Sequence, residues 1–201
     1  ARTELAKFEH AIRDDLNMRV PRVLCVLKPL KVVITNYPDD LVEELDAPYY
    51  PHDVPKEGSR TLPFSKEIWI DRDDFMEDPP KKYHRLAPGA EVRLRFSYVI
   101  RCTEVIKDSD GRVVELRCQY DASTAGGQNP DGRKVKGIIH WASATHGATI
   151  EVRLIDRLFT VPDPAAQEDF LAHLNPDSEV IVREALRLDP GLKVAAVWCK
   201  L

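Results

Sequence analysis

The stretch DGRKVKGIIHW, residues 131–141, opens with the turn formers Asp131 and Gly132, continues with basic side chains and ends in the largely apolar run IIHW. Branched aliphatic and aromatic residues fit the pleated, half-buried surface of a sheet. We therefore expect a strand over residues 134–143 that enters the core directly from a positively charged loop. The fold class should follow from how many such strands the chain supplies.

The rest of the chain repeats this pattern of short strands and turns. Residues 22–35, RVLCVLKPLKVVIT, are rich in branched side chains, and Pro29 in their middle predicts two short strands joined at a bend. The Asp110-Gly111 step predicts a hairpin in which both turn residues have positive φ. Short strands at this spacing are typical of barrels or a sandwich. Further strands are expected over residues 67–71, 91–106, 112–120, 149–156 and 179–188.

The N-terminal residues carry a helical pattern instead. Thr3 is a candidate N-cap, and Pro21 ends the pattern. A single apolar stripe needs a surface to cover, so this helix is expected to be the end of a larger helical element. The stripe consists of Leu5, Phe8, Ile12 and Leu16.

A second, internal helix is expected over residues 164–174, with Asp163 as its cap and Pro164 in the first turn. Prolines or glycines cluster in residues 36–62 and 121–132, which predicts two long surface excursions. The inward face of the internal helix would consist of Phe170, Leu171 and Leu174.

Composition indicates a globular chain. At 201 residues with 43% hydrophobic content, it can bury a substantial core, as one large all-β domain or two small ones. It has no apolar run of membrane-spanning length and no signal-peptide core, so we expect a cytoplasmic protein without membrane contact. The cysteines form no CxxC pair and predict reduced, partly buried thiols and no zinc site; they are Cys25, Cys102, Cys118 and Cys199.

Charge is distributed unevenly along the chain. The net charge of −4 disfavours an indiscriminate phosphate binder, which is usually basic overall. A local basic surface on an acidic body favours selective docking. The alternative is that these charges only solvate the outer faces of strands. Acidic residues gather at 39–46 and 71–78, whereas positive charge gathers at 81–85, 93–95 and 133–136.

Three segments, in the same order, resemble one protein family. They are GSRTLPFSKEIWIDRDDF at residues 58–75, DGRKVKGIIHW at 131–141 and VRLIDRLFTVPDP at 152–164. Together they resemble the C-terminal, anticodon-reading half of the glutaminyl-tRNA synthetases, which are class I aminoacyl-tRNA synthetases. The resemblance covers nearly the whole chain and fades beyond Asp189, where the QFER-type stretch usual in the family is absent.

This resemblance implies a mainly β fold of two β-barrels, proximal and distal, preceded by the end of a helical stalk and containing one internal helix. Residues 1–20 would end the helical connection to a catalytic domain. Residues 21–30 together with 140–201 would form the proximal barrel, and residues 31–139 would form the distal barrel.

The implied function is anticodon recognition of tRNA-Gln, within a parent enzyme that ligates glutamine to this tRNA with ATP and magnesium. The sequence contains no HIGH-like or KMSKS-like motif and no Gly-rich phosphate loop. This chain by itself is therefore expected to bind RNA without catalysis and without a cofactor or metal. The implied partners are the anticodon loop of tRNA-Gln and the catalytic domain of the same protein, in a monomer that does not bind DNA.

The candidate RNA-binding residues come from the same resemblance. Arg22 in VPRVLCV matches an arginine that contacts the anticodon, and Arg85 matches one that contacts the third anticodon base. The rigid, planar guanidinium can address base edges and stack on an unstacked base. Lys82 and His84 replace the glutamine and lysine of some members. The full set is Arg22, Lys82, Tyr83, His84, Arg85, Arg93 and Arg95, with Arg133, Lys134 and Lys136 as weaker candidates for phosphates of the anticodon stem.

Each assignment has a structural alternative. Arg93 and Arg95, two apart on an expected strand, would project from one face toward the first anticodon nucleotide, or would only solvate that face. Tyr83 would stack on a base or pack at a barrel edge. His140 is expected to be a satisfied core histidine. Its spacing from His146 does not suit a pair of ligands on one regular element.

Rival functions remain open at this point. One is an enzyme acting alone through Cys118 or a histidine, although no nucleophile has a base in a recognisable context. Others are a barrel RNA-binding module of ribosomal-protein type, or an interaction domain that works through the acidic loops. Within the synthetases, the anticodon-binding region of an archaeal or eukaryotic-type glutamyl-tRNA synthetase is the alternative, although the IHW run at 139–141 favours the glutamine type.

Overall fold

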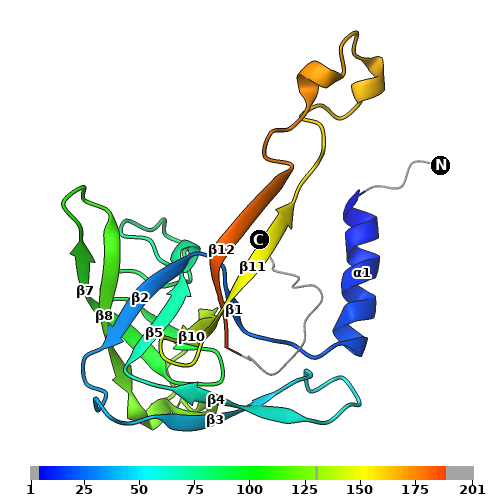
Figure 1. Cartoon of the computed structure of the whole chain (residues 1–201). Helices are drawn as coiled ribbons and strands as arrows, with labels where there is room; N and C mark the ends of the chain where they lie inside the picture. The colour runs from blue at the N-terminus through cyan, green and yellow to red at the C-terminus, as the bar shows by residue number, and fades with distance from the viewer. Residues whose placement is uncertain (1–4, 130, 189–201) are drawn as a thin grey trace.

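A computed structural model of the chain describes residues 5–129 and 131–188, and it shows one helix followed by a mainly β structure (Figure 1). The expected N-cap Thr3 lies outside these residues. The elements are α1 (Leu5–Arg19), β1 (Cys25–Val26), β2 (Pro29–Ile34), β3 (Glu43–Pro48), β4 (Ser59–Phe64), β5 (Glu67–Asp71), β6 (Glu91–Leu94), β7 (Val99–Lys107), β8 (Val113–Asp121), β9 (Ile138–Ile139), β10 (Trp141–Ser143), β11 (Ala148–Ile155) and β12 (Glu179–Arg187). The mainly β prediction is confirmed.

The largest sheet has seven strands in the order β10-β5-β2-β8-β7-β6-β9, and it curls into a nearly closed barrel. Its two edge strands are consecutive in sequence and are separated only by His140. At one edge β9 pairs in parallel with β6, and at the other β10 pairs antiparallel with β5. One continuous stretch of backbone, residues 138–143, therefore joins both edges of the sheet.

The core fills the inside of this curled sheet. Alternate residues of β2 are fully buried, as the period of a half-buried strand requires. Trp141 is completely buried, its ring meets Phe64 edge-on at 5.1 Å, and its indole nitrogen donates to the carbonyl of Arg95 at 2.8 Å. The aromatic cluster continues through Tyr37, Tyr98 and Tyr120.

A second, three-stranded sheet in the order β1-β12-β11 projects from the barrel as a long ribbon (Figure 1). Its inner face packs Ile150, Val152 and Leu154 against Cys25 and Leu27. This sheet joins β1 to β12, as expected if residues 21–30 and 140–201 form one barrel. However, β10, which lies within residues 140–201, pairs with β5 in the larger sheet. The division into proximal and distal barrels stays a prediction.

Two expected strands are each split in the structure. Residues 91–106 form β6 and β7, because a tight turn at Arg95 to Tyr98 reverses the chain, with Phe96 at φ 63° and the amide of Leu94 donating to the carbonyl of Tyr98. Residues 134–143 form β9 and β10, because the chain leaves one edge of the sheet and joins the other at His140. Alternating patterns continue through both breaks, so the sequence does not reveal them.

The expected α-helix over residues 164–174 is wrong. The segment contains two short 3-10 turns, Pro164–Ala166 and Leu171–His173, and the Asp163 side chain makes no capping bond. Phe170, Leu171 and Leu174 are exposed, at 49%, 59% and 44%. A short helix depends on burying an apolar face, and at the tip of the ribbon these three side chains stay largely exposed, although the ring of Phe170 lies 6.2 Å from that of Phe159.

The expected surface excursion over residues 36–62 is also partly ordered. It forms the hairpin of β3 and β4, whose paired residues run from Glu43 opposite Phe64 to Pro48 opposite Ser59. Ala47 and Leu62 are completely buried. Residues 36–42 and the proline-rich tip, residues 49–58, are irregular; in the tip, prolines cannot donate to a ladder.

The hairpin predicted at Asp110-Gly111 is confirmed and joins β7 to β8. Only Gly111 has a positive φ, of 79°, so the two-residue turn with two left-handed residues is wrong. The amide of Gly111 donates to the carbonyl of Asp108, and that of Asp108 to the carbonyl of Arg112. This is the three-residue type I loop with a glycine bulge.

Within the described residues, no helix is both long and apolar enough to cross a membrane. Cys25, Cys102 and Cys118 are buried free thiols, as predicted, and Cys199 lies outside the described residues.

Replacing Trp141 should destabilise the whole barrel. We expect Trp141→Ala to lower the free energy of unfolding by about 3 to 5 kcal/mol, because it leaves a large cavity and removes the hydrogen bond to Arg95. Urea denaturation followed by circular dichroism measures this. Ile138→Ala, at a neighbouring side chain that is 56% exposed, is the control and should cost less than about 1 kcal/mol. Equal losses for both variants would contradict this account of the core.

Candidate nucleic-acid interface

Arg22 and Arg95 come together from distant parts of the chain. Arg22 follows α1, and its guanidinium donates to the Asn17 side chain at 3.0 Å. Arg95 lies in the turn after β6, with its guanidinium 5.3 Å from the centre of the Phe96 ring. Burial lowers the pKa of Arg95, and the positive charge of Arg22 lowers it further. Among the described residues no carboxylate pairs with either guanidinium, so this site is electrostatically prepared for an anion.

His140 borders the same site at the seam between β9 and β10. Desolvation by the surrounding protein lowers the pKa of its imidazole, the charge of Arg95 acts in the same direction, and a hydrogen bond to the backbone of Cys25 opposes both. The residue is nevertheless exposed on one side, so the prediction of a core histidine is wrong. The chain crosses between the two sheet edges here, and this crossing turns the side chain away from the core.

The basic segment, residues 81–85, lies between β5 and β6. Lys81, Lys82, His84 and Arg85 are exposed, whereas Tyr83 is half-buried. The guanidinium of Arg85 pairs with Asp74, whose carboxylate is mostly covered. Burial raises the pKa of Asp74, and the pairing with Arg85 opposes that rise. The segment therefore presents positive charge with one arginine held in place.

The hydroxyl of Tyr83 is buried and has no hydrogen-bond partner among the described residues. Burial raises its pKa. The hydroxyl end of Tyr83 is therefore packed inside the protein, as in the barrel-edge alternative. Stacking of the Tyr83 ring on a base stays a prediction.

Arg93 serves the fold itself. Its side chain is buried and donates to the carbonyls of Ser97, Thr124 and Gln128 at 2.8 to 3.1 Å, and to the Asn129 side chain at 2.8 Å. Arg95 lies beyond the end of β6, so the expectation that the two arginines share one strand face is wrong. Arg93 connects the turn after β6 to the loop after β8, which leaves its guanidinium turned inward.

The loop that leads into β9 carries the weaker candidates. Arg133 pairs with Asp121, with Asp131 at 3.3 Å and with Glu91 at 3.5 Å, so three carboxylates surround its charge. Lys134 and Lys136 are exposed and have no ion-pair partner among the described residues. The two lysines, and not Arg133, carry the uncompensated charge of this loop.

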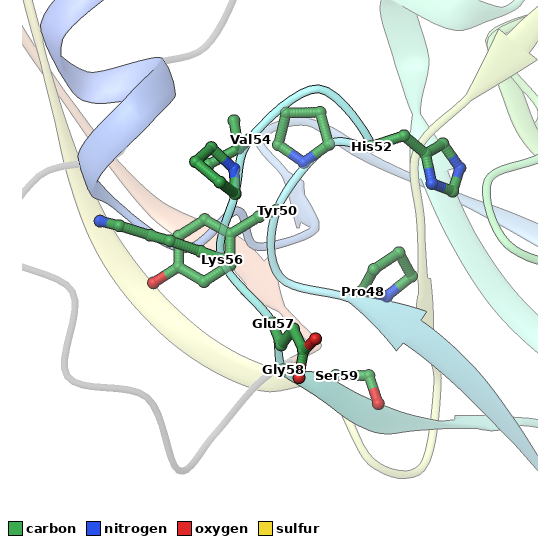
Figure 2. Close-up of a pocket in the computed structure, with 10 residues that line it drawn as sticks. Pro48, Tyr50, His52, Val54, Lys56, Glu57, Gly58 and Ser59 are labelled. Carbon is green, nitrogen blue, oxygen red and sulfur yellow. The ribbon is translucent and has the colours of Figure 1, made fainter.

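Sequence reasoning missed the surface formed by the tip of the β3–β4 hairpin. Figure 2 shows the hollow there, with Lys56 lying across the ring of Tyr50; its ammonium is 5.4 Å from the ring centre and donates to the carbonyl of Arg19. A second hollow, between this tip and α1, is lined partly by Arg22 and Asn17. The aromatic pair Tyr49-Tyr50 within a proline-rich stretch was the available signal.

Within residues 5–129 and 131–188, no group of three or more His, Cys, Asp or Glu side chains is arranged to hold a metal ion.

Barrel domains that bind nucleic acid present basic and aromatic side chains on a curled β-sheet, and this chain has the same arrangement. Two family profiles, each described as "tRNA synthetases class I (E and Q), anti-codon binding domain", match residues 20–121 and 138–197. The chain belongs to this family, and the resemblance found in the sequence is confirmed.

Individual relatives agree with the family match. The chain is 54% identical over 195 residues to a glutamine–tRNA ligase of Pseudomonas putida, covering 96% of this chain and 34% of that protein. It is 55% identical over 192 residues to the ligase of Pseudomonas syringae pv. tomato (94% and 33%), and 52% identical over 192 residues to that of Tolumonas auensis (96% and 34%). The chain thus spans about a third of the length of these relatives.

The contribution of Arg93 to the stability of the fold can be measured on the free protein, without RNA. We expect Arg93→Lys to lower the free energy of unfolding by about 2 kcal/mol, because a single ammonium cannot serve all four acceptors and leaves buried carbonyls unpaired. Thermal and urea unfolding measure the loss. The control is Arg101→Lys, at an exposed ion pair with Glu91, where the change should stay below about 1 kcal/mol. If Arg93→Lys left the free energy of unfolding unchanged, the four hydrogen bonds of Arg93 would not stabilise the fold, and Arg93 would again be a candidate for RNA contact.

Proposed function

We propose that this chain reads the anticodon loop of tRNA-Gln as part of a glutamine–tRNA ligase. The observation that carries the proposal is the pair Arg22 and Arg95 in a member of the anticodon-binding family: their positive charges act on each other, and no carboxylate of residues 5–129 or 131–188 pairs with either guanidinium. The assignment to glutamine rests on relatives that are more than half identical and are named glutamine–tRNA ligases.

The proposed mechanism assigns different tasks to different arginines. Arg95 and Arg22 hold an unstacked base or its phosphate, since no carboxylate in the described part of the chain forms an ion pair with either of them. Arg85 presents one edge of its guanidinium to a base while Asp74 orients the other, a restraint that lowers the entropy lost on binding. Lys82 and His84 flank this contact, and Lys134 and Lys136 attract phosphates of the stem.

The ligation of glutamine with ATP and magnesium belongs, in this proposal, to the remaining two-thirds of a protein like the relatives. The residues of this chain are assigned to RNA alone. A catalytic domain of the same protein, a monomeric state and a cytoplasmic location complete the proposal.

A second candidate shares the fold. The matched family description covers both the glutamate and the glutamine enzymes. An anticodon-binding region of a glutamyl-tRNA synthetase would hold the same barrel but prefer a different anticodon. The anticodon preference of the chain separates the two candidates.

Binding to anticodon stem-loops tests the proposal. Fluorescence anisotropy should show tighter binding to a stem-loop with the anticodon CUG than to loops with one anticodon base changed, and the preference should survive added salt while the overall affinity falls. A stem-loop with a glutamate anticodon is also tested, and tighter binding to that loop would favour the glutamyl-tRNA synthetase candidate. Equal, salt-sensitive binding to all loops would sink anticodon reading by this chain.

Arg85 gives a sharper test. We expect Arg85→Ala to weaken binding to the CUG loop by about 1 to 3 kcal/mol, and to weaken binding to a loop with a changed third anticodon base by less. Arg117→Ala is the matched control, since Arg117 is exposed and paired with Glu104 on the outside of the barrel. An equal loss on both loops would reduce Arg85 to a phosphate contact.

A further inference from the structure

Gly137 lies where the loop 131–137 passes the basic segment, residues 81–85. It is buried, and a Cβ atom built on it would lie 2.0 Å from the carbonyl oxygen of His84 and 3.2 Å from a methyl group of Val92. Its φ is outside the left-handed region, so its conformation is open to other residues. The space taken by the His84 backbone is the main reason that glycine is required here, and the Val92 methyl group adds a milder restriction.

The side of the contact that carries Gly137 is fixed in the barrel. The carbonyl of Gly137 accepts from the amide of Arg93 at 2.9 Å, and the next residues, Ile138–Ile139, pair with β6 as the edge strand β9. Val92 behind it is completely buried. Moving β9 to accommodate a methyl group at position 137 would disturb this hydrogen bond and the pairing with β6.

The side that carries His84 is softer. The basic segment is exposed except for Tyr83, and it is anchored at Leu86, whose amide donates to the carbonyl of Asp74 and whose carbonyl accepts from the amide of Met76. Contacts to a Cβ below 3.0 Å are essentially never seen, so an alanine at 137 would displace the His84 carbonyl by about 1 Å. Arg85 and Tyr83, its sequence neighbours, would move with it.

We propose that Gly137 is a positioning residue for RNA recognition: by admitting the His84 backbone against β9, it sets where Arg85 stands relative to the anticodon. This inference rests on the proposed function of Arg85. It explains why the basic loop 131–137 ends in a glycine immediately before an apolar strand.

Two readouts on the full chain test it. In free Gly137→Ala, hydrogen exchange of the Met76 and Leu86 amides should accelerate, because both hydrogen bonds anchor the displaced segment. In binding assays, the preference of Gly137→Ala for CUG over a loop with a changed third anticodon base should fall about tenfold, with a smaller change in affinity for the changed loop.

Gly147→Ala is the matched control. A Cβ at Gly147 would meet the carbonyl oxygen of Ser143 at 2.8 Å, a milder backbone contact of the same kind on the loop between β10 and β11. It should lower stability without changing either the exchange of Leu86 or the third-base preference. If both glycine variants change the preference alike, Gly137 has only a general structural role.

A compensating variant covers the case in which Gly137→Ala does not fold. In His84→Gly/Gly137→Ala the peptide at position 84 can rotate its carbonyl away from the methyl group, so folding should return, and the third-base preference should approach that of His84→Gly alone. Failure of this rescue would overturn the proposed contact. A wild-type chain without anticodon preference would instead refute the proposed function, and the exchange experiment would still decide whether Gly137 positions the segment.

Discussion

The structure depends on one crossing of the chain, at His140. Up to Ile139 the backbone forms β9, the strand at one edge of the seven-stranded sheet. From Trp141 onward it forms β10, the strand at the opposite edge. A curled sheet with two open edges would expose unpaired amides and carbonyls at both. Here residues 138–143 pair with β6 through β9 and with β5 through β10, and they place Trp141 in the core. The basic loop that precedes them is thereby held against the barrel.

The same crossing organises the charged surface. Arg93 in β6 and Arg95 just after it have different surroundings: Arg93 turns inward to hold the loop after β8, while Arg95 faces Arg22 and His140. Arg85 and Arg133 are partly neutralised by Asp74 and by three carboxylates, respectively. A chain with net charge −4 thus keeps uncompensated positive charge at particular places, among them the pair Arg22 and Arg95. Such local charge favours a specific RNA partner over phosphate backbone in general.

Some elements were predictable because their causes are local. The strand at 67–71 matched its alternating pattern to the residue, and Pro29 marked the start of β2, since proline at a strand's first residue costs no ladder bond. The hairpin at Gly111 followed from the only residue type that adopts positive φ freely. The helix predicted at 164–174 did not form because its apolar residues stay largely exposed at the tip of the ribbon, and periodicity in the sequence does not show whether a face will be covered.

The sequence by itself determined the fold class, the family, and the identity of the basic side chains, because these depend on residue type, periodicity and matched motifs. Only the tertiary structure decided which arginines face outward. Arg93 and Arg95 are alike in type and nearly adjacent, yet one is consumed by carbonyls 31 and 35 residues away and the other faces a second arginine. Likewise, the need for glycine at 137 comes from the His84 carbonyl, a neighbour in space and not in sequence. Such neighbours are set by the curling of the sheet, which brings distant segments together.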